Sequence, residues 1–403
     1  MRVDNPSPER MAGYFASLDL HVRRCKEAEA FEQNYFLDLG THVVRVIAYS
    51  KKFASHIEKQ LTYVLRDSAD HYDATLIVWQ DSQIGSLAQE LVSEPKPQNP
   101  LRDRVYKLAG VELPKQEEAV DNHLLVFEHA ISTLRAVIEI NPWANIVQAW
   151  NPLTNTHYYA VENLEPEEFI KQGHIFVQTL NKILKSPTSG LVHGAAIGLN
   201  KKGILFCARG QRGKSTLAVR AMLDGFEYVS DDYLVLGKDD SGLYAWPIYS
   251  IITLSAMMYG DLYPNLNVKF VSNNARKDKY VFNIENYHER FEMRYPIKLC
   301  MFPQIVNDPD PSIVECNNAG KGRAIVELVH STISQMGDNH DIGTIKKIMN
   351  FVKDLPFYQI NICRDIDKNL QCLRKFLKDG VCSKQENVSG MLHSRAVPPK
   401  TIY

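Results

Sequence analysis

The sequence has no long apolar run and no apolar segment near its beginning. None of its apolar stretches approaches the roughly 18 residues that mark a membrane-spanning helix. Its first residues, MRVDNPSPERM, are polar and lack the apolar centre of a signal peptide. These absences argue against a transmembrane helix and a secretion signal, and they predict a cytoplasmic protein with no membrane partner.

The sequence also lacks an excess of charge of either sign. It has 46 Lys and Arg against 47 Asp and Glu, so its formal net charge is −1. Proteins that bind nucleic acid or an anionic membrane surface usually show a strong basic excess. The balance therefore argues against a nucleic-acid partner.

Cysteine is scarce and follows no metal-binding or redox spacing. The seven cysteines are scattered, their number is odd, and no Cys-x-x-Cys pair or Cys/His cluster occurs. Zinc sites and disulfide frameworks show regular spacings. We therefore expect reduced thiols, as in a cytosolic protein.

Length and composition predict two domains. The 403 residues exceed one typical domain, and the apolar fraction of 45% suffices for sizeable cores. We expect an N-terminal α+β lobe at 1–160 that selects the substrate, an α/β region at 161–382, and a flexible tail at 383–403. Whether the lobe is a separate domain or continues the sheet of the next region is left open.

Apolar periodicity predicts the elements of both regions. In the lobe, a polar and helix-prone segment over 1–40 precedes a β-α-β unit and an antiparallel meander, with strands at 43–48, 75–79, 124–127, 133–140, 146–150 and 157–161 and a helix at 52–66. The second region begins with a helix at 165–184 and a strand at 191–197. It ends in alternating elements that would complete an α/β layer, with strands at 297–306 and 357–363 and helices at 319–336, 341–354 and 366–379.

The stretch from Lys202 to Leu236 has the layout of a phosphate-binding P-loop. An apolar strand precedes a glycine-containing loop, and a helix with one apolar face follows and stops at Gly225. In a P-loop, backbone N–H groups converge on phosphate oxygens, a Lys reaches the outer phosphates, and a Ser or Thr hydroxyl binds Mg²⁺. We therefore predict that nucleotide phosphates bind to Gly210, Gln211, Arg212, Gly213, Lys214, Ser215 and Thr216.

The loop departs from the usual pattern at its first position. Ala208 stands where the pattern has Gly, and alanine adopts a positive φ less easily, so we expect a constrained loop. The alternative is an exposed Gly-Lys-Ser-Thr turn that binds no phosphate. The strand, loop and helix in succession favour the P-loop.

An acidic pair follows the P-loop helix. Asp231 and Asp232 stand at the end of a strand that would lie beside the P-loop strand, so both carboxylates would face the outer phosphate. One acid can hold Mg²⁺ while the other accepts the proton of an attacking hydroxyl. The alternative is a solvated turn, because Ser-Asp-Asp is also good turn chemistry.

Taken together, these motifs resemble the bacterial HPr kinase/phosphorylase family, whose core is similar to that of phosphoenolpyruvate carboxykinases. The resemblance covers about residues 185–240, with a weaker likeness to about 380, and rests on the order and spacing of His193-Gly194, the P-loop, Gly225 and Asp231-Asp232. A counterpart of the family's downstream Glu-Ile-Arg-Gly signature is absent. The likeness is therefore to the broader group of kinase-like relatives.

The resemblance implies an α/β fold with a P-loop core of this type, and ATP and Mg²⁺ as cofactors. Carried over residue by residue, Lys214 would bind phosphate, while Ser215 and Asp232 would hold Mg²⁺. Asp231 would transfer the proton, and His193 would be a polar partner close to the phosphate.

Both histidines of this region, His193 and His174, could also have a purely structural role. A single histidine in an apolar strand, such as His193, is often a core residue whose ring nitrogens are satisfied by the backbone. His174 falls inside the helix predicted at 165–184, where we expect it on the helix surface without a functional role.

The predicted function is an ATP-dependent, Mg²⁺-requiring kinase that phosphorylates a hydroxyl, with a serine of a protein or peptide as the expected acceptor. One alternative is a nucleotide-binding regulatory or scaffold protein with little turnover, which the departures at Ala208 and Gln211 favour. Another is a phosphotransferase acting on a small molecule, either free serine or a carboxylate metabolite. A homo-oligomer is left open.

Overall fold

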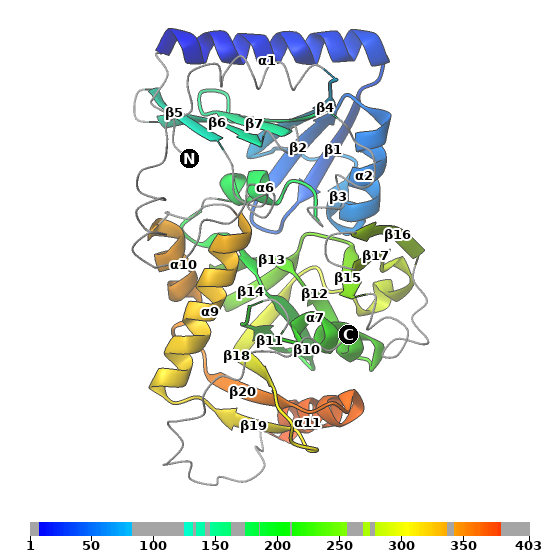
Figure 1. Cartoon of the computed structure of the whole chain (residues 1–403), viewed down its shortest axis with the longest axis vertical. Helices are drawn as coiled ribbons and strands as arrows, with labels where there is room; N and C mark the ends of the chain where they lie inside the picture. The colour runs from blue at the N-terminus through cyan, green and yellow to red at the C-terminus, as the bar shows by residue number, and fades with distance from the viewer. Residues whose placement is uncertain are drawn as a thin grey trace, which may run out of the picture.

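The computed structural model has a mixed α/β fold with an upper and a lower part (Figure 1). The residues that it describes are 8–82, 125–131, 134–141, 146–162, 174–184, 186–209, 212–255, 269–274, 279–336 and 342–379. Among these residues, no helix combines the length and the apolar character that crossing a bilayer requires. The predicted tail at 383–403 lies outside the described residues.

The upper part is built on an eight-stranded sheet in the order β3-β1-β2-β4-β8-β7-β6-β5. Its strands are β1 (Gln33–Asp38), β2 (Val43–Ala48), β3 (Leu65–Arg66), β4 (Ala74–Gln80), β5 (Leu125–Ile131), β6 (Leu134–Asn141), β7 (Ile146–Asn151) and β8 (Thr156–Val161). The predicted β-α-β unit is confirmed, because β2 and β4 are parallel and α2 (Lys51–Leu61) connects them. The predicted antiparallel meander is confirmed as β5 to β8.

Two elements of this part differ from the prediction. Residues 33–38, expected to be polar and helix-prone, form β1, whose buried Tyr35 and Leu37 alternate with less buried neighbours while the strand pairs with β2. The helix expected at 52–66 ends at Leu61. A 3₁₀ turn, η1 (Thr62–Val64), follows it, and Leu65 then pairs with Leu37 across β3 and β1.

The two faces of the upper sheet are covered by different helices. Helix α1 (Pro8–Glu29) covers one face (Figure 1), where it packs against Trp79 and Tyr158. The adjacent residues Val78 and Tyr159 point to the opposite face, towards α2 and α6 (Val177–Ile183). This side-to-side alternation is the two-residue period of a strand buried on both faces.

The lower part contains a nine-stranded sheet. Its strands are β9 (Ser189–His193), β10 (Ala195–Leu199), β11 (Lys202–Phe206), β12 (Glu227–Ser230), β13 (Tyr233–Asp239), β14 (Gly242–Pro247), β18 (Tyr295–Ile305), β19 (Ser312–Glu315) and β20 (Phe357–Ile362). A smaller three-stranded sheet consists of β15 (Ile251–Ser255), β16 (Lys269–Asn274) and β17 (Lys279–Asn283), and the 3₁₀ helix η2 (Glu285–Arg290) follows it.

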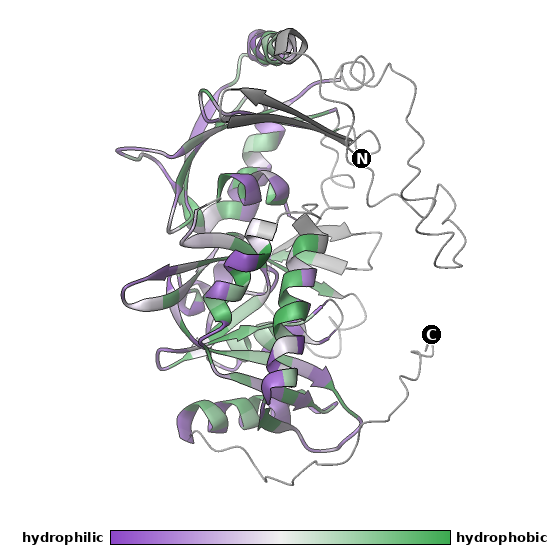
Figure 2. Cartoon of the chain, turned by 90° about the vertical axis from the view of Figure 1, so that its left-hand side faces the viewer, coloured by the Kyte–Doolittle hydropathy of each residue, from purple (hydrophilic) through white to green (hydrophobic). Residues whose placement is uncertain are grey.

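Helices lie on both sides of the parallel core strands β11, β18 and β20. Helices α7 (Lys214–Leu223) and α11 (Ile366–Asp379) pack on one side. Helices α9 (Asn318–Met336) and α10 (Ile342–Val352) pack on the other side (Figure 1). In Figure 2, apolar residues follow these strands and the helices beside them. The late alternation of helices and strands predicted from the sequence is confirmed.

The two parts share one hydrophobic cluster although their sheets are separate. Leu191 on β9 and Tyr233 on β13 belong to the same buried cluster as Phe53 on α2 and Phe176 next to α6. The upper part is therefore packed against β9 and β13, the strand that ends at His193 and the strand that follows the acidic pair. The division of the chain into domains at residue 160 stays a prediction.

Helix α7 ends at the glycine that the sequence marks as its stop. The N–H of Gly225 donates to the carbonyl of Met222 (3.1 Å), and the N–H of Phe226 donates to that of Ala221 (2.9 Å). This pair of bonds is a Schellman motif, and it places Gly225 at a φ of +90°.

Replacing Gly225 with alanine should lower the free energy of unfolding by about 1 kcal/mol, because a Cβ is strained in the left-handed region. The new Cβ would lie 3.8 Å or more from other atoms, so the loss would come from backbone strain and not from a collision. Urea denaturation measures the loss. Asparagine tolerates this conformation better, so Gly225→Asn should lose less, and equal losses would contradict the explanation.

Candidate functional site

The predicted phosphate-binding loop connects β11 to α7. Cys207, Ala208 and Arg209 follow the strand, and Arg212 and Gly213 precede the helix. Gly213 has a φ of +86°, a conformation that favours glycine. Gly210 and Gln211, both predicted to bind phosphate, lie outside the described residues.

Ala208 fits the loop without the strain expected from the sequence. Its side chain is fully buried, and it is not among the described non-glycine residues with a positive φ. The backbone at this position therefore does not require glycine. The expectation that alanine constrains the loop through its φ is wrong.

Lys214 is the first residue of α7, and its side chain turns back over the loop. Its Nζ donates hydrogen bonds to the carbonyl oxygens of Ala208 (2.6 Å) and Arg209 (3.1 Å), and the residue is only 5% exposed. Buried amino groups of this kind need such partners. The positive charge is thus held between the loop and the N-terminal end of a helix, where the helix dipole also favours an anion.

The loop is also tied to the opposite helix layer. Arg209 Nε lies 3.0 Å from Glu327 Oε2 on α9, and this carboxylate is nearly buried. The same Arg209 supplies one of the carbonyls that hold Lys214. The ion pair therefore fixes the part of the loop on which the Lys214 amino group rests.

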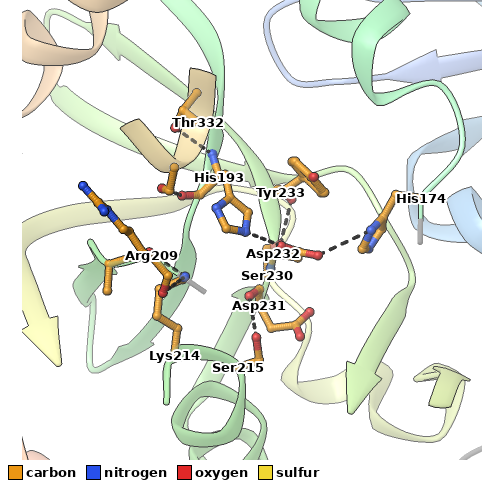
Figure 3. Close-up of polar contacts among 12 residues, drawn as sticks. His174, His193, Arg209, Lys214, Ser215, Ser230, Asp231, Asp232, Tyr233 and Thr332 are labelled. Carbon is orange, nitrogen blue, oxygen red and sulfur yellow. Dashed lines mark hydrogen bonds and ion pairs between the residues drawn. The ribbon is translucent and has the colours of Figure 1, made fainter. Parts of the chain in front are cut away.

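Ser215 and Thr216 lie in the first turn of α7, as the sequence predicts. The Ser215 hydroxyl donates to the main-chain carbonyl of Asp231 (3.2 Å), which brings the acidic pair to the start of the helix (Figure 3). Thr216 and Arg212 are half-buried. The structure therefore brings Lys214, Ser215 and Asp231 together at one end of α7.

Asp231 and Asp232 connect β12 to β13, and their side chains have different surroundings. Asp231 is only 2% exposed, and its Oδ1 accepts a hydrogen bond from the hydroxyl of the buried Tyr228 (2.9 Å). The side chain of Asp232 is 23% exposed. The turn is held in part by Ser230, whose hydroxyl donates to the carbonyl of Tyr233 (2.7 Å).

The Asp232 carboxylate lies between two histidines (Figure 3). His193 Nε2 is 2.6 Å from Asp232 Oδ1, and His174 Nδ1 is 3.5 Å from Asp232 Oδ2. His193 is the last residue of β9, which pairs with β13 so that His193 lies opposite Tyr233. Its backbone is also fixed by α9, because its N–H donates to the Thr332 hydroxyl (3.0 Å).

His174 is a residue of this site that the sequence interpretation missed. It was expected on the surface of a helix, but α6 begins at Val177, and His174 precedes it with an exposure of 3%. Its ring packs against those of Tyr233 (5.1 Å between centroids) and Tyr249 (4.3 Å). No local pattern marks this residue, because its contact with Asp232 depends on how the connection from the upper part is packed.

Two tyrosines, Tyr233 and Tyr249, line the side of the site next to His174. Burial raises the pKa of Tyr233 and of Tyr249 well above the ordinary tyrosine value. The Tyr249 hydroxyl donates to the carbonyl of Ile175 (2.5 Å), next to His174 in the chain. Both phenols therefore stay protonated at neutral pH, and the charges beside them belong to Asp232 and its neighbours.

Comparison with known proteins gives a distant likeness. No protein-family model matches the sequence, and no curated protein matches it. Among solved structures, the chain is similar to the HPr(Ser) kinase/phosphatase from Coxiella burnetii, with 12% sequence identity and a TM-score of 0.26. The matched region covers 46% of this chain and 94% of that one.

The donor atoms around the acidic pair suit a magnesium ion bound together with phosphate. The described residues contain no group of three or more His, Cys, Asp and Glu side chains placed to hold a metal by themselves. Mg²⁺ typically uses one or two carboxylates and completes its shell with water and substrate phosphates. Ser215, Asp231 and Asp232 offer hydroxyl and carboxylate oxygens of that kind.

Proposed function

We propose that this protein is an ATP-dependent, Mg²⁺-requiring kinase that transfers the γ-phosphoryl group to a hydroxyl, with a serine of a protein or peptide as the acceptor. One observation carries the proposal. The buried amino group of Lys214 is held by loop carbonyls at the N-terminal end of α7, and the acidic pair reaches the same end through Ser215. The motifs that resemble the HPr kinase/phosphorylase family support it.

In this proposal the loop and Lys214 bind the phosphates. Amide N–H groups at the start of α7 would donate to phosphate oxygens, and Lys214 would move from its two carbonyl partners to the outer phosphates. Phosphoryl transfer depends mainly on positioning and on neutralising charge. A lysine already confined to the loop would lose little conformational freedom when it makes this contact.

Ser215 and Asp232 would hold the Mg²⁺, which supplies charge neutralisation between the phosphates when it is bound. His193 and His174 would fix the orientation of the Asp232 carboxylate through their contacts with its two oxygens. Carboxylates and histidines that bind metals are commonly fixed by such outer contacts. The proposed part of His193 in the reaction is therefore to position Asp232 next to the phosphates.

Asp231 would accept the proton of the attacking hydroxyl. The Tyr228 hydroxyl fixes one carboxylate oxygen of Asp231, and the turn between β12 and β13 fixes its backbone. A proton acceptor must lie within hydrogen-bonding reach of the acceptor hydroxyl when the substrate is bound. Because Asp231 is only 2% exposed, the arriving substrate must open a path to it.

The burial of Asp231 also favours a second candidate function. A carboxylate enclosed by Tyr228 and its neighbours would be of little use to an acceptor if the site never opened. The protein would then bind ATP as a regulatory or scaffold protein with little turnover. The two functions differ in whether bound ATP is consumed.

Replacing Asp231 with asparagine separates the two functions. Asparagine keeps an oxygen for the Tyr228 hydroxyl but cannot take up a proton, so transfer should fall by about 10²- to 10⁴-fold, the usual contribution of a general base. The Kd for ATP should stay within about threefold, because the phosphate contacts remain. Labelled ATP with Mg²⁺ and cell lysate or serine peptides measures transfer, and calorimetry measures binding.

The matched control for this test is Asp240→Asn. Asp240 is exposed at the turn between β13 and β14, so its change should leave both transfer and binding intact. ATP binding by the unchanged protein without transfer to any acceptor would favour the scaffold. Undiminished transfer in Asp231→Asn would remove Asp231 from the mechanism.

A further inference from the structure

The upper part of the molecule contains a cavity of about 660 Å³ that the proposed kinase site does not use. It lies where α1 crosses the ends of two strands, among residues of α1, the start of α2 and the segment after β4. The polar residues that matter most in its lining are Arg24, Ser50, Lys51, Lys52, Gln80 and Asp81. In Figure 1, α1 lies at the top of the molecule and α7 in its lower half. This volume is that of a typical small-molecule site.

The position of the cavity follows from the sheet topology. The parallel strands β2 and β4 have their carboxyl ends, Ala48 and Gln80, at the same end of the sheet. Helix α2 begins at Lys51, shortly after β2, so its N-terminus lies near these strand ends. Open α/β sheets bind their ligands in the crevice outside the carboxyl ends of parallel strands.

Ser50 provides a buried polar group that lacks a partner. It precedes α2 with an extended backbone (φ −145°, ψ 132°), but its side chain makes no capping hydrogen bond. Ser50 is 2% exposed and lines the cavity, and its hydroxyl makes no hydrogen bond with the residues that the structure describes. Because this hydroxyl lines the cavity, it is available to bond a group held there.

The charges at the start of α2 indicate that this group is an anion. The first turn carries Lys51 and Lys52 and no acidic residue. Lysine is unfavourable there because the helix dipole makes this end positive, and the first N–H groups of the helix also lack acceptors. Arg24 on α1 adds a third cation to the lining. A bound phosphate would turn this unfavourable arrangement into a favourable one.

The acidic residues of the lining lie on the other elements. Asp81 forms an ion pair with His21 on α1, and Glu29 lies near the end of α1. Carboxylates repel a phosphate but accept hydrogen bonds from hydroxyl groups. The repulsion by these carboxylates would therefore place the phosphate close to α2. Gln80 and Asp81 would then bind the uncharged hydroxyl groups of the ligand.

We propose that this cavity is a binding site for a small phosphate ester, with its phosphate at the N-terminal end of α2 and its hydroxyl groups towards Gln80 and Asp81. The proposal is independent of the kinase function, because it uses no residue of the P-loop. A free metabolite is the occupant, since the cavity has the volume of a small-molecule site and residues of α1 line it.

Calorimetric titration with glycerol phosphate and with inorganic phosphate tests this proposal. The P-loop would also bind phosphate, so the titrations use full-length protein with Lys214→Met, which removes the P-loop charge but keeps most of the side-chain volume. One saturable site should remain in this background. Adding Lys51→Glu and Lys52→Glu should weaken it by at least about tenfold, because charge-assisted phosphate contacts are replaced by repulsion.

Two further variants test the hydroxyl of Ser50 and the position of the lysine charges along α2. Ser50→Ala should weaken binding by about threefold to tenfold through the loss of one hydrogen bond. It should not change unfolding, because Ser50 makes no capping bond. Lys59→Glu reverses one lysine charge in the last turn of α2 and should leave binding unchanged, whereas Lys51→Glu alone should already weaken it. No saturable binding with Lys214→Met alone, or equal affinities with glutamate at 51 and 52 and at 59, would overturn the proposal.

Discussion

Replacing Lys214 with methionine should lower phosphoryl transfer by about 10³-fold or more and weaken ATP binding by at least about tenfold. Methionine fills much of the same space but carries no charge, so the outer phosphates would lose the cation that neutralises them. The carbonyls of Ala208 and Arg209 would also lose their donor. Transfer from labelled ATP and calorimetry with Mg²⁺ and ATP measure the two effects.

Lys202→Met is the matched control for this prediction. Lys202 lies at the other end of β11, and its amino group also donates to a carbonyl, that of Leu377 (2.7 Å). The control loses the same kind of hydrogen bond without touching the loop, so its transfer and ATP affinity should be unchanged. If the two variants behave alike, Lys214 has a structural role and the proposed function fails.

Replacing Gly203 with alanine should lower the free energy of unfolding by about 3 kcal/mol, the upper part of the range for overpacking a core. Gly203 lies in β11, where this strand runs parallel to β18. A Cβ there would lie 2.2 Å from the main-chain oxygen of Pro296. The backbone of a central strand cannot move aside as a flexible side chain would, so the pair of strands before the loop that leads to α7 would be displaced. Urea denaturation measures the loss of stability.

The same substitution at Gly322 is the control for Gly203. Gly322 lies inside α9, and a Cβ there would have no atom within 4 Å. Alanine should stabilise the helix by about 0.5–1 kcal/mol, because glycine loses more conformational freedom on folding. A loss at Gly203 no larger than the usual effect of a surface change would show that β11 and β18 are not packed this closely.

The strand-loop-helix unit formed by β11, the loop after it and α7 could be predicted because its signals are local. A buried strand, a loop ending in Gly213 and Lys214, and a helix stopped at Gly225 are each specified by neighbouring residues. The positive φ of both glycines, the Schellman bonds and the buried face of α7 agree with that reading. The βαβ unit and the meander of the upper part were predictable for the same reason, since alternating apolar residues mark a strand wherever it later pairs.

Strand β1 was missed because its pattern is short and weak. Its apolar residues are few, and the strand becomes recognisable through its pairing with β2 and β3. The burial that holds it comes from residues distant in sequence, such as those of α2. Tertiary packing overrides weak local preference in segments of this kind.

By itself, the amino-acid sequence determined the loop between β11 and α7, the lysine that follows it and the place of the acidic pair after β12, because these depend on residues close together in the chain. The tertiary structure alone decided that His174 contacts Asp232, that Ser50 and two lysines line a cavity beneath α1, and that both sheets share one hydrophobic cluster. These features join residues far apart in the chain. Contacts of that kind depend on sheet topology and on how helices pack over it, and no local pattern of residues encodes either one.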